Sequence, residues 1–295
     1  MNNNLKNWSE IDDLQVLETS LTKTHVANEN NLMLVDSNNL GYRWLKSKKH
    51  NSFGDEYLRT VESLGKSYSA KEIICLFDFG KSYYRMEIHP EYKSTRKKPE
   101  TEEEQKHYDE FFECLNTLQE LLPYDVYKYR GVEADDTITY FVENLKNHYD
   151  NIWIITSDRD MYQLVDDNIH IFNIFGRKEI TVDSILIDYE LNPSEYLLAR
   201  LIEGDKSDSI TGIEGVGPIR SQNLARTYKT LESLLKAIPI KGTSQYIKNL
   251  NANQEILSRN DRLINLKKHH EEAIKSGKGG DLTWKELQAR VTSYT

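Results

Sequence analysis

Aspartates follow three of the short apolar runs in this chain, at the points where predicted strands would end. Asp36 follows the first run, Asp78 the second, and Asp158 and Asp160 a later one. If the runs are neighbouring parallel strands, their carboxyl ends meet at one edge of a sheet, which is where open α/β sheets bind ligands. Carboxylates gathered there repel one another unless cations lie between them, and hard divalent ions such as Mg²⁺ prefer oxygen ligands. The pattern predicts a metal-dependent phosphodiesterase.

Further acids occur in two other stretches of the sequence. Glu133, Asp135 and Asp136 open a predicted helix, while Asp205 and Asp208 lie in a glycine-rich stretch. A single aspartate after a strand is often only a turn or cap residue, and acids in a first helical turn complement the helix dipole. Three acids within four residues exceed what capping requires, so we expect the helix acids to contribute to a metal site.

Glycines recur in the run Gly-Ile-Glu-Gly-Val-Gly, at Gly212, Gly215 and Gly217, between two predicted helices. Glycine permits a positive φ and a close backbone approach. A hairpin of this pattern can point its amide groups at a phosphate. The alternative interpretation is a plain helix–loop–helix turn. The stretch 205–216 is not an EF-hand, because its ligand spacing and terminal residue are wrong.

The elements that would position these residues are those of a doubly wound α/β sheet. The predicted strands are 31–36, 72–78, 125–129, 151–157 and 168–174, with a predicted crossover helix at 56–70. Helical patterns dominate after residue 190. We therefore divide the chain into an N-terminal extension (1–30), an α/β core (31–190) and a helical region (191–295). The extension carries a weak helical pattern, which fits a docked helix and a mobile tail equally well.

Residues 80–100 interrupt the alternation of strands and helices. The segment is basic and aromatic, without a regular apolar period, and it ends shortly before a predicted capping box at Thr101 and Glu104. In a capping box each side chain accepts from a backbone donor of the other residue. A helix with an apolar face should start there.

Composition indicates a globular protein without secretory or membrane-spanning segments. Of 295 residues 38% are hydrophobic and 29% are charged, and no apolar run approaches spanning length. Two cysteines are too few for a Cys-rich zinc site and favour a reducing cytoplasm. The net charge of −9 argues against a nucleic-acid partner, although ions bound to an acidic cluster would cancel much of that charge locally.

Five motifs follow one another along the chain. They are LMLVDSNNL at 32–40, PEYKSTR at 90–96, RGVEADD at 130–136, SDRD at 157–160, and GDKSD with GIEGVG at 204–217. Together they resemble the flap endonuclease and 5′→3′ exonuclease family, particularly the free-standing phage enzymes and, more distantly, the 5′-nuclease domain of bacterial DNA polymerase I. The resemblance implies a PIN-like (resolvase-like), mainly parallel twisted sheet flanked by helices, a helical arch at 80–112 and a C-terminal helix-three-turn-helix region.

The resemblance also implies roles for individual residues. One Mg²⁺ would be held by Asp36, Asp78, Glu133, Asp135 and Asp136, and a second by Asp158, Asp160, Asp205 and Asp208. Mn²⁺ could substitute, and the glycine motif could bind K⁺. Lys93 and Arg96 would act on the scissile phosphate and count as catalytic with Asp78 and Asp136, and Tyr92 would stack a base. DNA contacts would also come from Arg43, Arg130, Gly212, Gly215, Gly217 and Arg220.

The implied activity is that of a structure-specific 5′ nuclease in DNA replication or repair. It would be a cytoplasmic monomer acting on DNA with a single-stranded 5′ flap or a free 5′ end, in the host cytoplasm if phage-encoded. Two metal ions would support hydrolysis to a 5′-phosphate and a 3′-hydroxyl. The chain departs from the family pattern at Ser209, Thr211 and Ile219. These departures concern the grip on duplex DNA and leave the acids intact.

Three other interpretations remain open from the residues. Asp158 and Asp160 could belong to an aspartyl-nucleophile phosphomonoesterase, but that class needs its aspartate pair after the first strand, and here the pair follows the fourth. A non-catalytic DNA-binding module would use the glycine hairpin and keep the acids for structure only. The third interpretation is RNase H-like removal of RNA from RNA:DNA hybrids.

Overall fold

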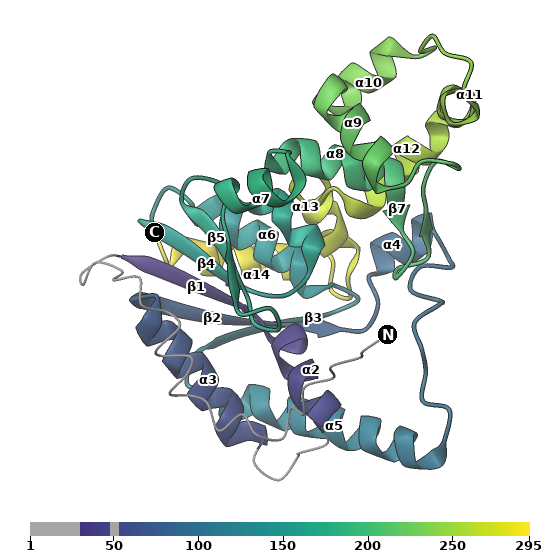
Figure 1. The fold of residues 1–295 in the computed structure, drawn as a ribbon. Coiled ribbons are helices and arrows are strands. Elements are labelled where there is room, and N and C mark those ends of the chain that lie inside the picture. The colour runs from purple at the N-terminus through teal and green to yellow at the C-terminus, as the bar shows by residue number, and fades with distance from the viewer. Residues whose placement is uncertain (1–29, 48–52) are drawn as a thin grey trace, which may run out of the picture.

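The computed structural model describes residues 30–47 and 53–295. They form a six-stranded sheet and the helices around it (Figure 1). The predicted extension 1–30 therefore lies outside the described residues except for Asn30. The strands are β1 (Asn31–Asp36), β2 (Ala70–Phe79), β3 (Asp125–Arg130), β4 (Asn151–Ile155), β5 (Ile169–Asn173) and β6 (Lys178–Ile180). They lie in the order β3-β2-β1-β4-β5-β6. The first five are parallel to their neighbours, and β6 pairs antiparallel with β5.

The central strand β1 sets the position of the functional edge. The chain runs outward from β1 to β2 and β3, and then returns to place β4 and β5 on the other side. This reversal of strand order opens a crevice at the carboxyl ends of β1 and its neighbours. All six residues of β1 are buried, which explains its continuous apolar run, since a parallel strand covered on both faces has no polar side.

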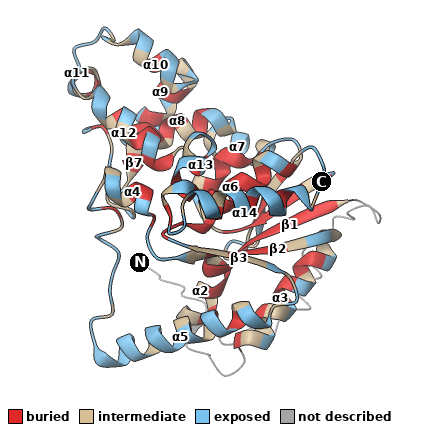
Figure 2. Cartoon of the chain, turned by 180° about the vertical axis from the view of Figure 1, so that it is seen from behind, coloured by how far each residue is buried: buried red, intermediate tan, exposed pale blue. Residues whose placement is uncertain are grey.

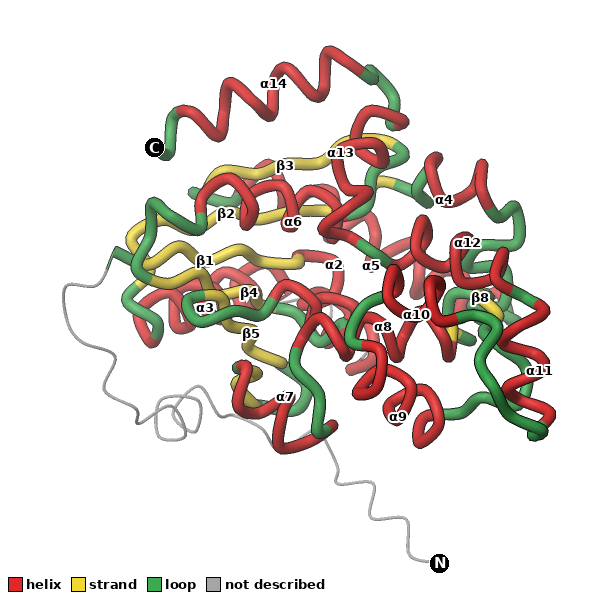
Figure 3. The backbone as a smooth tube through the Cα atoms, turned by 90° about the horizontal axis from the view of Figure 1, so that it is seen from above, coloured by secondary structure: helices red, strands yellow, loops and turns green. Residues whose placement is uncertain are grey.

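Helices cover both faces of the sheet. One face packs against α2 (Ser37–Ser47), α3 (Phe53–Ser67) and α5 (Glu102–Leu121), around a core that includes Phe53, Tyr57 and Phe111. The other face carries α6 (Ala134–Leu145), with α13 (Leu266–Ser276) and α14 (Asp281–Thr292) packed on it. Buried residues concentrate on β1, β2, α6 and α8 (Pro193–Glu203) (Figure 2). The view from above shows the helices on both sides of the strands (Figure 3).

The remaining elements lie beside the carboxyl edge and in the C-terminal half. They are α4 (Tyr83–Ile88), η2 (Arg159–Leu164), α7 (Val182–Tyr189), β7 (Gly204–Asp205), β8 (Ile210–Thr211), α9 (Pro218–Tyr228), α10 (Leu231–Ala237), α11 (Gln245–Ala252) and α12 (Gln254–Ile264). Between α4 and α5 the chain runs as turns and coil along one side of the molecule (Figure 1). This connection is part of the segment 80–112 that the sequence predicts to be an arch.

The predicted mainly parallel α/β architecture agrees with the structure, and all five predicted strands are present. Sequence analysis missed β6, the β7–β8 hairpin and α4, which are too short to show a period. The predicted capping box forms only in part. Thr101 accepts from the Glu104 amide at 3.1 Å, but the Glu104 carboxylate accepts from the Glu100 amide instead of that of Thr101.

The C-terminal helices return to the core. Helices α13 and α14 both contact α6, and Ile274 and Leu287 belong to the same apolar cluster as Ile138 of α6. The boundary at residue 190 remains a prediction, because this cluster is continuous across it. No helix in the described ranges has the length and apolar character needed to cross a membrane.

Candidate active site

Three strand ends bring aspartates to the predicted edge of the sheet. Asp36 is the last residue of β1, and its backbone pairs with Leu76, so Asp78 of β2 lies just beyond it. Two asparagines that follow Asp36 tie the strand ends together. The Asn38 side chain accepts from the Asp78 amide at 3.1 Å, and the Asn39 side chain accepts from the Ser157 amide, which follows β4, at 2.9 Å. The sequence LVDSNN therefore fixes the relative positions of β1, β2 and β4.

The start of α6 is capped by an acid from the sheet. Asp78 accepts a hydrogen bond from the Ala134 amide at 2.7 Å, so a carboxylate of β2 satisfies a donor at the helix N-terminus. Glu133, the residue at the N-cap position, makes no side-chain capping bond. Because Asp78 caps the helix in place of Glu133, the Glu133 carboxylate can bond to side chains of the predicted arch segment. The same contact places Asp135, in the first turn of α6, beside the acids at the strand ends.

Four aspartates form a central group at this edge: Asp36, Asp78, Asp135 and Asp158. Burial, with the charge of Asp78 next, raises the pKa of Asp36 to about 8. Burial also raises the pKa of Asp78 and of Asp158. For Asp135, burial and the charges of Asp158 and Asp36 raise the pKa far above its usual range. Each shift has burial as its largest cause, and the four aspartates repel one another when ionised.

A second group joins the arch segment to the core through Glu133 and Asp208. Lys93 donates to Glu133 at 2.6 Å, and the Tyr92 hydroxyl donates to Glu133 at 2.8 Å and to Asp208 at 3.2 Å. Arg96 donates to Asp208 at 2.7 Å. Burial alone would raise the pKa of Glu133, but Lys93 and Arg85 lower it to about 2. These contacts place the predicted cations Lys93 and Arg96 among the acids.

Backbone strain occurs where the arch meets the glycine-rich stretch. Lys93 has φ +56° and Ser209 has φ +63°, a left-handed conformation that is uncommon for residues other than glycine. The Lys93 amide donates to the Asp208 carbonyl at 3.0 Å, and the Ser209 hydroxyl accepts from the Thr95 amide at 3.2 Å. Such conformations persist only where the surroundings fix them, and they concentrate at functional sites.

Two arginines that sequence analysis did not single out complete the site. Arg85 of α4 donates to both oxygens of Asp136, at 2.6 and 2.8 Å, and to the Leu263 carbonyl of α12 at 2.9 Å. Arg200 of α8 donates to Asp160 at 2.8 Å and to Asp205 at 2.7 Å. The sequence carries no signal for the bonds from Arg85 to Asp136 and from Arg200 to Asp160, because these residues lie far apart in the chain.

One of these pairs involves a predicted site residue. Asp136 is predicted as a catalytic residue and metal ligand; both of its oxygens accept from Arg85, and the two side chains are 1% and 6% exposed. In this structure Asp136 anchors α4, at the base of the predicted arch, to α6, and its role toward a metal stays a prediction.

The acids fit divalent metal ions by their chemistry and charge, although they do not form a finished ligand shell. Among the residues that the structure describes, no three Asp, Glu, His or Cys side chains are placed to hold one metal ion together. The central aspartates nevertheless offer hard oxygen ligands, and burial together with their mutual repulsion raises their pKa values, which a bound cation would offset. Side-chain rotation toward a shared ion would relieve this repulsion.

Among the predicted DNA contacts, Tyr92 requires a correction. The Tyr92 ring is 3% exposed and its hydroxyl is held by Glu133 and Asp208, so it has no free face for a base. Arg43, on α2, stands 5.8 Å from the Trp44 ring. Arg130, at the end of β3, is exposed next to Phe79.

The glycine motif forms a tight loop between β8 and α9. A Cβ at Gly212 would lie 2.0 Å from the Glu203 carbonyl oxygen, and Gly215 has φ +80°, so both positions require glycine. Gly217 precedes α9 as its N-cap residue. The Arg220 guanidinium donates to the Gly215 carbonyl and packs 4.7 Å from the Tyr246 ring centre.

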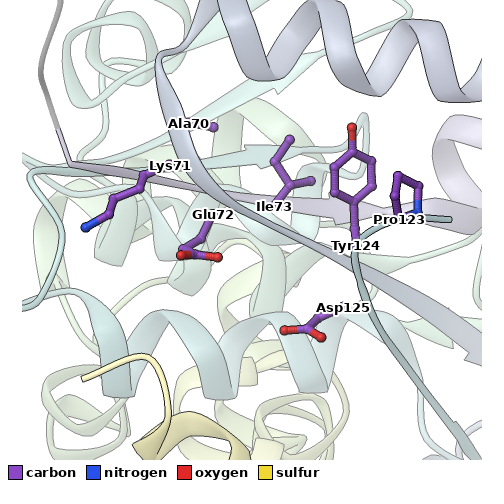
Figure 4. Close-up of a pocket in the computed structure, with 7 residues that line it drawn as sticks. All are labelled: Ala70, Lys71, Glu72, Ile73, Pro123, Tyr124 and Asp125. Carbon is purple, nitrogen blue, oxygen red and sulfur yellow. The ribbon is translucent and has the colours of Figure 1, made fainter.

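A hollow of about 450 Å³ lies away from these acids, lined by residues 70–73 and 123–125 (Figure 4). Its lining belongs to the start of β2 and to the approach to β3, at the amino ends of the strands. Parallel α/β sheets bind their ligands at the opposite end. We therefore place the active site at the open carboxyl edge, and not in this hollow.

Comparison with known proteins shows the family to which the chain belongs. Residues 31–190 match the model of the 5′-3′ exonuclease N-terminal, resolvase-like domain. The chain is 36% identical over 258 residues to the flap endonuclease of Escherichia phage T5, covering 85% of this chain and 89% of that protein. The chain belongs to the 5′-3′ exonuclease family. The predicted family, the resolvase-like fold class and the assignment as a metal-dependent nuclease are thereby confirmed.

A solved structure of the phage T5 protein and one further relative extend this comparison. A crystal structure of the phage T5 flap endonuclease, in a pseudo-enzyme-product complex with DNA and metal ions, superposes with a TM-score of 0.84 at 34% identity, over 90% of this chain and 99% of that one. DNA polymerase I of Thermus aquaticus is 29% identical over 70% of this chain, which corresponds to 25% of the polymerase. The predicted relationship to polymerase I is confirmed as well.

The raised pKa values predict how the stability of this 5′-3′ exonuclease depends on pH. A folded-state pKa above the unfolded value of about 4 means that the native state holds extra protons, so the metal-free protein should lose stability between about pH 4 and about pH 8. The low pKa of Glu133 acts in the opposite direction, but only below its own unfolded value near 4. Thermal unfolding with EDTA should therefore show a lower Tm at about pH 8 than at about pH 5.

Divalent ions should reverse this loss, because ligands that bind only the native state raise its stability. The increase in Tm on replacing EDTA by Mg²⁺ should be larger at the higher pH, where the central aspartates are ionised. An Mg²⁺-induced increase in Tm that is equal at both pH values would contradict the assignment of these aspartates as ligands.

Proposed function

We propose that this member of the family is a structure-specific 5′ nuclease that acts on DNA with a single-stranded 5′ flap or a free 5′ end. It would hydrolyse phosphodiester bonds to a 5′-phosphate and a 3′-hydroxyl during replication or repair. The observation that supports this most strongly is the central group of aspartates at the carboxyl edge, beside the second group in which Lys93 and Arg96 pair with Glu133 and Asp208.

Asp36, Asp78, Asp135 and Asp158 would provide the main metal ligands. Four other acids would have only a supporting role, because each of them already pairs with a cation of the chain. They are Glu133, Asp160, Asp205 and Asp208. Two Mg²⁺ ions, or Mn²⁺ in their place, would polarise the phosphate and lower the pKa of an attacking water.

Among the side chains that do not bind metal, Lys93 has the main catalytic role in the proposed mechanism. Its ammonium group lies 2.6 Å from Glu133 and 3.9 Å from Asp208, and these charges keep its pKa above the usual range although burial opposes this. Lys93 therefore stays protonated. When bound cations balance the acids, its ammonium can turn to the scissile phosphate and offset the charge that builds on the phosphate oxygens.

Other residues of the chain position these groups. Asn38 fixes the backbone of Asp78, and Arg85 holds α4, at the base of the arch, against α6 and α12. Lys81 donates to the carbonyls of Tyr92 and Lys93, at 3.0 and 3.4 Å, and supports the strained turn. Tyr92 orients Glu133 and Asp208 and does not contact DNA in this proposal.

Duplex DNA would be gripped by Arg220 and the glycine loop, which would form a helix-three-turn-helix element. Arg43 and Arg130 would contact DNA outside this loop. The amides of such a loop suit phosphates of any sequence. A K⁺ ion there would have to compete with two donors of the chain, because Arg220 occupies the Gly215 carbonyl and Asn249 occupies that of Glu214. We place the protein, as a monomer, in the cytoplasm of a bacterial host if it is phage-encoded.

Product mapping tests the proposed function. Flap, nicked and single-stranded DNA, each labelled on the 5′-tailed strand, should be cleaved with Mg²⁺ and remain intact with EDTA. The flap should be cut close to the junction, leaving a 3′-hydroxyl that a polymerase can extend and a 5′-phosphate that a ligase can join. Absence of cleavage on every DNA substrate, or faster cleavage of a matched RNA:DNA hybrid, would overturn the proposal in favour of the corresponding alternative.

A further inference from the structure

Two aromatic side chains that the proposed function does not use lie exposed at the carboxyl edge. Phe79, the residue after Asp78, is 37% exposed at the end of β2, and Tyr83, at the start of α4, is 46% exposed. The pairing of β1 with β2 ends at Leu76, so Phe79 extends past the end of the central strand. Aromatic side chains that lie exposed close to cations are the elements from which single-strand binding sites are built.

Phe79 lies among cations from the neighbouring strand. Phe79 pairs with Arg130 in the register of β2 and β3, and the guanidinium carbon of Arg130 lies 4.5 Å from the centre of its ring. The Lys128 ammonium lies 4.9 Å from the same ring and donates to Asn116 of α5. Within the described chain, Arg130 has no carboxylate at ion-pair distance, so its charge is open to an external anion.

Tyr83 is held against the same strand end. Its amide donates to the Gly131 carbonyl at 2.9 Å, and the Gly131 amide donates to the Phe79 carbonyl at 2.8 Å. Gly131 has φ +79°, and a Cβ there would lie 2.6 Å from the Tyr83 ring. The ring therefore rests on a glycine that leaves room for it. Phe79 and Tyr83 are thus fixed to one turn next to Asp78.

We propose that Phe79 and Tyr83 form a stacking site for an unpaired base of the substrate strand, with Arg130 and Lys128 holding the phosphates on either side of that base. This inference rests on the proposed function and assigns to it the element that holds single-stranded DNA. Exposed aromatics interleaved with cations bind single strands in this way, independently of sequence, because every base has an aromatic face. Tyr92, the residue predicted from the sequence to stack a base, is buried and does not fill this role.

The charge pattern supports nucleic acid over an acidic protein as the partner. Phe79 directly follows Asp78 at the end of β2, and Arg130 lies 4.5 Å from its ring, so the aromatics and the cations gather at the same strand end as Asp78. A paired base has both faces covered by its neighbours and cannot stack there. The site therefore selects an unpaired nucleotide next to the cleavage point.

Fluorescence of 2-aminopurine tests the stacking directly. The probe is placed at successive unpaired positions of a 5′ flap, and binding is followed with EDTA so that no cleavage occurs. Wild-type protein should quench the probe at one position near the junction. The double variant Phe79→Leu with Tyr83→Leu keeps apolar volume but lacks aromatic faces. It should lose the quench and bind the flap about 5- to 100-fold more weakly, while Phe79→Trp should retain both.

Two controls separate this inference from the function on which it rests. Ile187→Ala removes an exposed apolar side chain on α7, distant in sequence from this turn, and should change neither quench nor affinity. If wild-type protein cleaves flaps with Mg²⁺ but the double variant shows the same quench and the same KM, the stacking site is wrong and the nuclease function stands. If wild-type protein cleaves no DNA, the proposed function itself has failed.

Discussion

Replacing Asp78 by asparagine is expected to lower kcat for Mg²⁺-dependent cleavage by about a thousandfold, the order of magnitude for losing a main electrostatic group of an active site. The charge of Asp78 raises the pKa of Asp36, and the charge of Glu133 raises the pKa of Asp78. Asp78 is therefore central to the proposed ligand set. Asparagine keeps the shape of the side chain and an oxygen that can still accept from the Ala134 amide, so the cap of α6 should survive. The affinity for DNA should change little, because a negatively charged side chain makes no attractive contact with DNA phosphates.

Single-turnover kinetics and metal-free binding measurements separate the two parameters for this variant. Asp183→Asn is the matched control, since Asp183 is an exposed acid in the first turn of α7, distant in sequence from the site. The control should cleave at the wild-type rate. Wild-type turnover by Asp78→Asn would contradict the role of the central aspartates.

Replacing Lys93 by alanine should lower kcat by about a hundredfold to a thousandfold, as expected when one charged group that stabilises a developing oxyanion is lost. Lys93 is 12% exposed and bonded to Glu133, so its charge acts where water screens it weakly. Single-turnover rates at saturating enzyme measure this effect independently of binding.

Lys97→Ala provides the control for Lys93→Ala, because Lys97 is an exposed lysine of the same segment. It should change affinity modestly, in a salt-dependent manner, and leave the single-turnover rate intact. If Lys93→Ala behaves in the same way, with weaker binding and an unchanged rate, Lys93 contacts the DNA backbone and has no catalytic role.

The sheet and its functional edge could be predicted because they follow from local patterns. A strand such as β1, buried on both faces, must be apolar, and an acid directly after it must lie at the carboxyl edge. The same reasoning located Asp78 and Asp158. The glycine loop was also predictable in part, since the close contact of Gly212 with Glu203 admits no side chain.

The cations that pair with the acids could not be predicted. Arg85 reaches Asp136 across 51 residues of sequence and Arg200 reaches Asp160 across 40, and only the packing of α4 and α8 brings these residues together. The burial of Tyr92 has the same origin. Its basic and aromatic surroundings favour a DNA contact, whereas the tertiary structure turns the ring inward and bonds its hydroxyl to Glu133.

Electron paramagnetic resonance of bound Mn²⁺ tests the central claim most directly. Titration of the wild-type protein should show two tightly bound ions per molecule, which Mg²⁺ displaces. Asp135→Asn should bind fewer ions and Asp183→Asn the same number as wild type, since only Asp135 lies in the central group. Equal binding by all three proteins would place the metal elsewhere and contradict the account of this site.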